Sequence, residues 1–280
     1  MKINKKELTL PGAGGRTITL DITSPVSKKP VPVLVFCHGF KGFKDWGHFN
    51  WVAGQCASAG MAFLKFNFSH NGIIPGNLSE ISDLEAFGNN NYSLELEDLD
   101  KVLDFVADKG KEYNLDAGEL YLAGHSRGGG IALLKASEDK RVRKLVLWAS
   151  VSEFDSFFRA STVEEWKKSG VVYAENKRTG QQLPLKKQFY DDYMEKKSSL
   201  DVQKAARLLS VPLLIIHGDQ DESVDIKHAE SLYNLVQHSI FIRVEGGGHT
   251  FGAKHPFNPE EDVTPMLEEL VENTVEFLMD

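Results

Sequence analysis

Short apolar runs recur along the chain and alternate with amphipathic segments. Such runs, with few polar positions, are typical of strands buried on both faces of a parallel sheet. They occur at Val31–His38, Met61–Phe68, Leu120–Gly124, Lys144–Ser150, Pro212–Gly218 and Ser239–Val244. Two earlier segments, Lys6–Leu10 and Arg16–Ile22, alternate apolar and polar residues around a PGAGG turn, and therefore predict a hairpin.

Amphipathic segments lie between these runs. In Ser93–Asp108 the apolar side chains repeat with a helical period, with Ser93 as a candidate N-cap and Gly110 as a candidate stop. Alternation of strands and helices predicts an α/β fold, with a mostly parallel sheet covered by helices on both faces. Similar patterns predict helices at Phe49–Ala59, Gly128–Ser137, Ile226–Val236 and Thr264–Met279.

One long stretch interrupts this alternation. We expect residues 1–150 and 211–280 to form the core, and residues 151–210 to form a small inserted cap over the carboxyl edge of the sheet, because so long an insertion is usually functional. The segment VVYAENKRTGQQLPL predicts a hairpin within the cap, with its turn near Lys177–Gly180. Its aromatic side chains either line a substrate pocket or form the cap's own core; they are Phe154, Phe157, Phe158, Trp166, Tyr173, Phe189, Tyr190 and Tyr193.

Composition narrows the class of protein. The chain has 280 residues, of which 41% are hydrophobic and 26% charged, enough to bury a large core. The formal net charge of −8 disfavours nucleic acid or anionic lipid as the main partner. We expect no signal peptide, and no run approaches the roughly 18 apolar residues that a membrane span needs. Cys37 and Cys56 lie in apolar patterns, which predicts reduced thiols and a cytoplasmic location.

A serine surrounded by glycines follows one of the buried strands. Gly124–Gly128 reads GHSRG and fits the G-x-S-x-G pattern, with a strand before it and a helix after it. In such an elbow the serine adopts a strained turn, and the glycines let neighbouring backbone approach. The Ser126 hydroxyl would then project at the carboxyl edge of the sheet, where parallel α/β folds bind ligands. The alternative is a glycine-rich turn with an incidental serine.

A serine nucleophile needs a base, and the base needs an acid that orients it. In an elbow fold these residues follow in the order serine, acid, histidine. Asp219 and Asp221 both follow the strand Pro212–Gly218. We prefer Asp221, because it lies on the turn beyond the strand, where Val224 can fix the loop.

The base is expected after the last strand. His249 follows three glycines there and is closer to that strand than His255. The sequence therefore predicts a catalytic triad of Ser126, Asp221 and His249.

The loop after Val31–His38 reads HGFKG and predicts an oxyanion hole. One backbone N–H comes from this loop and the other from the residue after the nucleophile. We assign Phe40 and Arg127, each worth about 10²–10³ in rate. The alternative is a tight glycine turn under the cap.

Signals for metals and cofactors are weak. The segment after Asp219 imitates a calcium loop, but Val224 stands where glycine is needed and a strand precedes it. We find no zinc spacing among the histidines and cysteines, and PGAGG precedes a strand rather than a helix. We therefore expect no metal and no cofactor. Cys37 lies within a strand and is not expected to be a nucleophile, whereas His70 could line the pocket or bond to the backbone.

The motifs HGF, GHSRGG, HGDQDESV and EGGGHTF together resemble the α/β-hydrolase superfamily. More narrowly, the chain is similar to bacterial cinnamoyl (feruloyl) esterase-like and dienelactone-hydrolase-like serine esterases. The resemblance spans nearly the whole chain and is weakest in the insertion. It implies an eight-stranded sheet, a Ser126–Asp221–His249 triad and hydrolysis of carboxyl esters without a cofactor. Dienelactone hydrolases proper carry cysteine at the elbow, where this chain has serine.

The leading hypothesis is a serine esterase that cleaves small-molecule carboxyl esters through an acyl-enzyme. The cap aromatics suggest an aromatic or medium-sized acyl group. The same triad could instead act on a peptide or amide bond, or transfer the acyl group to an alcohol or amine. A non-catalytic ligand receptor is a third possibility. The sequence leaves the natural substrate and the oligomeric state open.

Overall fold

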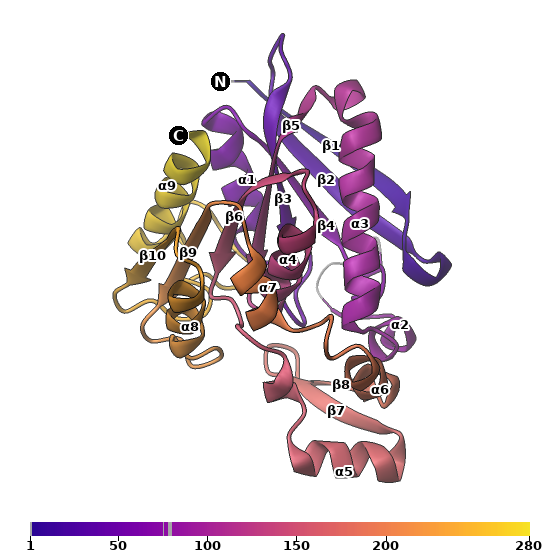
Figure 1. Cartoon of the computed structure of the whole chain (residues 1–280). Helices are drawn as coiled ribbons and strands as arrows, with labels where there is room; N and C mark the ends of the chain where they lie inside the picture. The colour runs from indigo at the N-terminus through magenta and orange to yellow at the C-terminus, as the bar shows by residue number, and fades with distance from the viewer. Residues whose placement is uncertain (1, 75, 78–79) are drawn as a thin grey trace.

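A twisted sheet forms the centre of the molecule (Figure 1). The computed structural model describes residues 2–74, 76–77 and 80–280. Within these residues the sheet has 8 strands in the order β1-β2-β4-β3-β5-β6-β9-β10. β1 and β2 form an antiparallel hairpin at one edge, β2 pairs antiparallel with β4, and the other pairs are parallel. The strands are β1 (Ile3–Pro11), β2 (Thr17–Pro25), β3 (Val31–Cys37), β4 (Ala62–Asn67), β5 (Leu115–His125), β6 (Val142–Trp148), β9 (Leu213–Gly218) and β10 (Ser239–Val244).

Alternating side chains of the central strands enter two separate hydrophobic cores. In β3, Val33 and Val35 belong to one core, whereas Leu34 and Phe36 belong to the other. A strand covered on both faces has no position for an exposed polar side chain, which explains the continuous apolar runs. The first core is completed by α3 (Tyr92–Lys109), α4 (Arg127–Glu138), α7 (Val202–Leu208) and α8 (Lys227–Leu235), and the second by α1 (Phe49–Ser58) and α9 (Pro265–Met279). The predicted α/β architecture is confirmed.

Some predicted boundaries are wrong. Helix α3 is capped by Asn91, whose side chain accepts a hydrogen bond from Leu94 N at 2.9 Å, and not by Ser93. Ser93 instead donates its hydroxyl proton to Asp192 of the cap. Strand β5 begins at Leu115, earlier than predicted. The apolar pattern missed the first half of this strand, because that half carries polar residues that lie partly exposed. Gly110 follows α3 as expected.

Short helices complete the core region. Helix α2 (Leu84–Gly88), which the sequence pattern did not predict, is capped by Asp83, whose side chain accepts from Ala86 N. The turns η1 (Ala13–Gly15), η2 (Gly110–Tyr113) and η3 (Asp155–Phe157) are 3-10 helices. Cys37 and Cys56 are free and buried, as expected. Among the described helices, none has the length and apolarity to cross a membrane.

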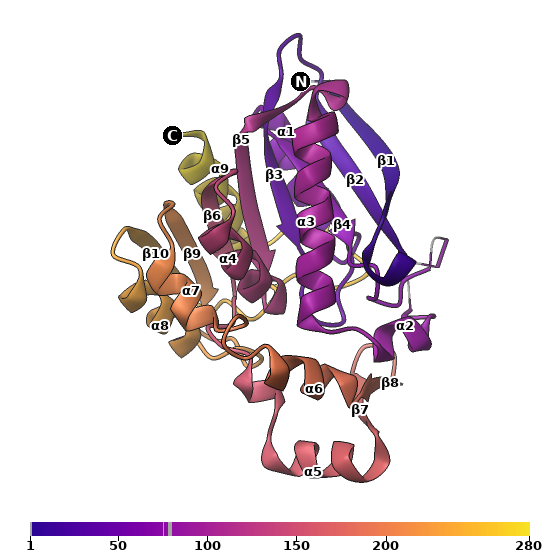
Figure 2. The same cartoon turned by 45° about the vertical axis from the view of Figure 1, so that its right-hand side comes forward.

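The cap elements gather at one end of the sheet (Figures 1 and 2). They are α5 (Ala160–Ser169), β7 (Val171–Asn176), β8 (Gln181–Lys186) and α6 (Gln188–Glu195), and β7 and β8 form the expected antiparallel hairpin. Helix α7, although it lies within 151–210, contacts α4 and α8. The division into a core and an inserted cap at 151–210 remains our proposal.

Most of the cap aromatics pack into a hydrophobic core, whereas Tyr173 is exposed. Phe154, Trp166, Phe189 and Tyr193 are buried, and Phe154 stacks on Tyr92 of α3 with ring centroids 3.9 Å apart. These rings extend the first hydrophobic core into the cap. Since a subdomain of this size needs its own core, their main role is to hold the cap on α3.

Candidate active site

Ser126 occupies a strained turn between β5 and α4. Its φ of 57° lies in the left-handed region, which costs a residue with a Cβ about 1–3 kcal/mol. The turn is fixed from both sides: Ser126 N donates to Trp148 O at 3.0 Å, and Ser126 O accepts from Gly129 N at 3.0 Å. A strained residue held by its surroundings in this way is typical of functional sites.

The flanking glycines are required by close backbone contacts. A Cβ on Gly124 would lie 2.3 Å from Gly128 O, and a Cβ on Gly128 would lie 2.4 Å from the carbonyl oxygens of Cys37 and His38. The start of α4 therefore lies directly against β5 and the end of β3. This packing is the physical reason for the spacing in G-x-S-x-G.

Asp221 is fully buried and bound to the loop after β10. Its Oδ2 accepts a hydrogen bond from His249 Nδ1 at 2.7 Å, and its Oδ1 accepts from Ser223 N at 2.8 Å and Val224 N at 2.9 Å. Burial favours the neutral acid, but hydrogen bonds from His217 and His249 hold the pKa of Asp221 well below its usual range. The Asp221 carboxyl group therefore stays ionised and can accept the hydrogen bond from the His249 imidazole.

Asp219, the alternative acid, has a different role. Its Oδ1 accepts a hydrogen bond from Gly246 N at 2.9 Å, which ties the end of β9 to the loop after β10. No hydrogen bond joins it to His249 among the described residues.

His249 and Ser126 line the same cavity, which has a volume of about 340 Å³. The His249 side chain is 21% exposed. Because Nδ1 donates to Asp221, Nε2 carries the free lone pair that a general base needs. The structure therefore brings the three predicted triad residues together at the carboxyl edge of the sheet.

Two further histidines support this arrangement, and the sequence analysis missed both. His125 Nε2 donates to the His249 backbone oxygen at 2.8 Å, and burial holds the pKa of His125 well below its ordinary value. His217 Nε2 lies 2.8 Å from Val224 O and 3.3 Å from Asp221 Oδ2. Both of these neighbours are acceptors, so this nitrogen carries the proton. Their positions in the sequence could have indicated this role, since His125 directly precedes the serine and His217 is the penultimate residue of β9.

The two predicted oxyanion donors lie on adjoining segments. A Cβ on Gly39 would lie 3.0 Å from Ser126 Cβ, so the HGF loop touches the elbow. Arg127 is the first residue of α4, where backbone N–H groups have no partner within the helix. Over the residues that the structure describes, neither Phe40 N nor Arg127 N has a hydrogen-bond acceptor.

Side chains connect these two donor residues. The Arg127 guanidinium forms a buried ion pair with Glu95 of α3 and lies 4.7 Å from the centroid of the Phe40 ring. Asn90 Nδ2 donates to Glu95 Oε1 at 2.8 Å. The ion pair and the cation–π contact together fix the HGF loop relative to α4. Sequence reasoning missed Glu95, because nothing in the helical pattern separates it from the exposed acids of α3.

The cavity rim carries aromatic and cationic side chains. Phe40, Trp46 and Phe49 supply the aromatic surface, and none of the cap aromatics singled out in the sequence lines it. The tip of the cap hairpin contributes Asn176, Lys177 and Arg178, and the HGF loop contributes Lys41.

The remaining candidates have structural contacts. His255 Nδ1 accepts from Gly47 N at 3.0 Å, and His70 Nδ1 lies 2.8 Å from Ser69 Oγ. Neither lines the cavity above Ser126. Burial raises the pKa of the Cys37 thiol, so it is a poor nucleophile. No group of three or more potential metal ligands occurs in the described part of the chain.

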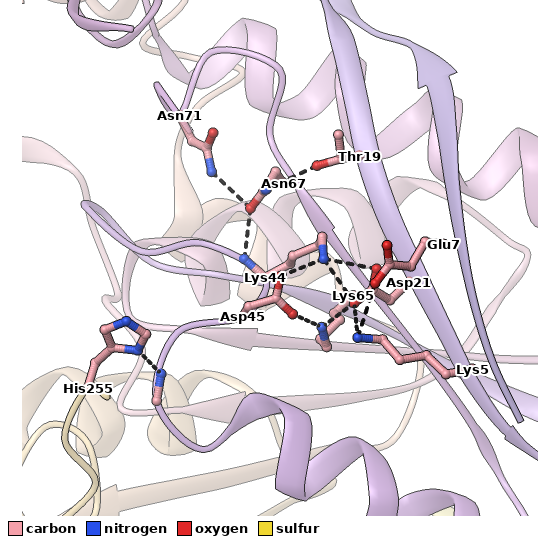
Figure 3. Close-up of polar contacts among 11 residues, drawn as sticks. Lys5, Glu7, Thr19, Asp21, Lys44, Asp45, Lys65, Asn67, Asn71 and His255 are labelled. Atoms are coloured by element: carbon pink, nitrogen blue, oxygen red, sulfur yellow. Dashed lines mark hydrogen bonds and ion pairs between the residues drawn. The ribbon is translucent and has the colours of Figure 1, made fainter. Parts of the chain in front are cut away.

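A second set of charged residues lies beside a larger cavity, of about 770 Å³. We call it the ionic cluster; its members are Lys5, Asp21, Lys44, Asp45 and Lys65 (Figure 3). Lys65 Nζ lies 2.6 Å from Asp21 Oδ2 and 2.6 Å from Asp45 Oδ1. The described residues that line this cavity include neither serine nor cysteine.

The sheet order and the serine on the turn after β5 define an α/β-hydrolase fold. Solved structures agree. Est1E from Butyrivibrio proteoclasticus with ferulic acid bound has a TM-score of 0.71 at 19% identity, over 97% of this chain and 98% of that chain. A putative hydrolase from Agrobacterium vitis has a TM-score of 0.73 at 19% identity, over 100% of both chains. A dienelactone hydrolase from Anabaena variabilis has a TM-score of 0.65 at 16% identity, over 100% and 98%.

The family follows from the sequence itself. The BD-FAE family model matches residues 20–236. The chain therefore belongs to the BD-FAE family, which is of the α/β-hydrolase-like serine esterases. None of the curated proteins matches this chain.

Proposed function

We propose that this protein is a serine esterase that hydrolyses small-molecule carboxyl esters through an acyl-enzyme. One observation carries the proposal: His249, held at 2.7 Å by the buried carboxylate of Asp221, shares a cavity with the strained Ser126. Nucleophile, base and orienting acid are the complete set that acyl transfer needs. A ligand receptor would need none of the three.

In the first half of the reaction, Ser126 Oγ attacks the acyl carbon and His249 Nε2 accepts the hydroxyl proton. The negative oxygen that forms is bound by the N–H groups of Phe40 and Arg127. The imidazolium, stabilised by Asp221, then gives its proton to the leaving alkoxide as the ester C–O bond breaks.

Water completes the cycle. It gives a proton to His249 while its oxygen attacks the acyl-enzyme carbon, and Ser126 Oγ leaves and takes the proton back. The products are one carboxylic acid and one alcohol, and the serine is regenerated.

The cavity favours a small substrate with an apolar or aromatic part. Its volume of about 340 Å³ and the rings of Phe40, Trp46 and Phe49 support this choice. The ferulic acid bound to Est1E, a structural neighbour, is a compound of this kind. Cys37 and Cys56, free and buried, support a cytoplasmic location.

Ester kinetics of Ser126→Ala test the proposal. The variant should hydrolyse p-nitrophenyl hexanoate about 10⁶-fold more slowly than the wild type, because the nucleophile is lost. Ser137→Ala is the matched control, since the Ser137 hydroxyl only donates to Leu134 O near the other end of α4. Near-normal turnover by Ser126→Ala would refute the proposal, and turnover of an amide but not of the ester would favour a peptidase or amidase.

A further inference from the structure

The cavity above Ser126 is cationic, although the chain as a whole has a net charge of −8. Its lining includes Lys41, Lys177 and Arg178, and the described lining residues include no Asp or Glu. We propose that the natural substrate is a carboxyl ester that also carries a free carboxylate, and that these three side chains bind it. The inference rests on the proposed esterase function and names its substrate class.

Lys41 connects the HGF loop to the cap. Its φ of 61° lies in the left-handed region, so this lysine occupies a position that disfavours any residue with a Cβ. Its Nζ donates to Glu175 O of β7 at 2.8 Å and lies 5.3 Å from the centroid of the Phe40 ring. The ammonium group is therefore positioned where the oxyanion loop and the cap hairpin meet.

The three cationic side chains line one cavity, and the charges of Lys41 and Lys177 oppose each other. Burial, and then the positive charge of Lys177, lower the pKa of Lys41, despite the opposing charge of Glu175. Like charges held near one another gain from an anion placed between them. A substrate carboxylate would supply that anion, and Arg178, which also lines the cavity, adds a further positive charge.

Neither Asp221 nor Glu175 lines the cavity, although the charge of Glu175 offsets part of that of Lys41. Asp221 is fully buried behind His249, and its oxygens already accept hydrogen bonds from the imidazole and the loop backbone. Glu175 is exposed and is not part of the cavity lining. The aromatic walls then fit the apolar part of the ester, and the cationic rim fits its charged end.

The test compares matched esters that differ in one charge. An anionic acyl group is probed with mono-p-nitrophenyl adipate against p-nitrophenyl hexanoate. An anionic alcohol is probed with meta-acetoxybenzoate against meta-acetoxybenzamide. Each rate is divided by the spontaneous rate of the same ester. We expect kcat/KM to favour the anionic member of at least one pair by about fivefold or more, since each partly exposed ion pair contributes up to about 1 kcal/mol.

Variants then test whether Lys177 and Arg178 cause the preference for the anionic esters. In Lys177→Gln/Arg178→Gln the anionic-to-neutral ratio should fall about three- to tenfold, and added salt should lower it in the wild type. Lys168→Gln is the control, because Lys168 is an exposed cap lysine on α5 that does not line the cavity, and it should leave the ratio unchanged.

The outcomes separate this inference from the proposed function. Ser126-dependent hydrolysis of the neutral esters, without preference for either anionic ester, keeps the esterase and overturns the inference. A preference that survives in the double variant overturns the assignment to this rim. If no ester is cleaved, the affinity of Ser126→Ala for each ester is measured by tryptophan fluorescence. Equal affinities for the anionic and neutral members of each pair overturn the inference. Tighter binding of the anionic member supports it.

Discussion

The ionic cluster and the triad are both groups of polar side chains beside a cavity, and they differ in which hydrogen-bonding groups lack a partner. The ionic cluster lies beside a cavity of about 770 Å³, and the triad beside one of about 340 Å³. In the ionic cluster each lysine has at least one carboxylate partner and each carboxylate at least two lysines (Figure 3). At the triad, the Ser126 hydroxyl, His249 Nε2 and the N–H groups of Phe40 and Arg127 have no hydrogen-bond partner in the part of the chain that the structure describes. Hydrogen-bonding groups without a partner at the cavity wall therefore indicate the candidate active site better than the volume of the cavity does.

The two clusters also act on different properties. The ionic cluster joins β2, β4 and the loop before α1, because Asp21, Lys65 and Lys44 come from these three segments. We expect its loss to lower stability, and loss of a triad member to lower turnover. The predictions below test this separation, beginning with the largest effect.

Replacement of Asp221 by Asn should lower kcat about 10⁴-fold while the fold is retained, because an amide cannot stabilise the imidazolium and favours the wrong tautomer. Asp219→Asn, two residues earlier, is the matched control. The Asn amide oxygen can still accept the hydrogen bonds that Gly246 N and Gln220 Nε2 donate to Asp219 Oδ1, so kcat should change by less than about tenfold. Steady-state ester kinetics measure both variants, and equal losses in the two would contradict our choice of acid.

Replacement of Lys65 by Met should reduce the free energy of unfolding by about 3–5 kcal/mol, because it leaves buried carboxylates short of a partner. Urea unfolding measures the change. Activity per folded molecule should stay near that of the wild type, since Lys65 does not line the triad cavity. Lys29→Met, which removes an exposed lysine, should change the free energy of unfolding by no more than about 0.5 kcal/mol. A large loss of activity in folded Lys65→Met would contradict the separation of roles.

Replacement of Glu95 by Gln should lower kcat about tenfold with a smaller change in KM, because the Arg127 guanidinium loses its buried ion pair and the two oxyanion donors become less well fixed. A purely structural role would lower stability and leave kcat per folded molecule intact. Comparison of kcat with KM, together with thermal unfolding, distinguishes the two roles.

The ionic cluster should make the stability of the fold depend on pH in the acid range. Burial opposes ionisation, but Lys65 and Lys44 hold the pKa values of Asp21 and Asp45 below their usual range. A depressed folded-state pKa gives stability that is complete above the unfolded-state pKa of about 3.9 and is lost as pH falls below it. The Tm of the wild type should therefore fall more steeply between about pH 4 and pH 2 than that of Lys65→Met. Parallel curves would show that the cluster does not control acid stability.

Most of the fold could be predicted from the sequence, because the central strands are buried on both faces and leave continuous apolar runs. The turn chemistry also gave Ser126, Asp221 and His249 as triad candidates before any geometry was known. What the pattern missed depends on distant contacts. Glu95 resembles any other acidic residue of α3 until Arg127 is placed beside it. The ionic cluster was missed for the same reason, since Asp21 and Lys65 meet only when β2 pairs with β4.

The cap shows the same limit. Its aromatics were equally consistent with a pocket wall and with a core. Their burial against Tyr92 of α3, and their absence from the lining of the cavity above Ser126, distinguish the two. Conversely, the sequence pattern indicates only a turn at Lys177 and Arg178, although the hairpin brings both residues to the rim of the cavity above Ser126.

Covalent labelling tests the central claim most directly. The folded protein is treated with a fluorophosphonate, and the modified peptide is identified by mass spectrometry. The account predicts one adduct on Ser126, absent from Ser126→Ala and formed much more slowly in Asp221→Asn. An adduct on another residue, or a folded protein that does not react, would contradict it.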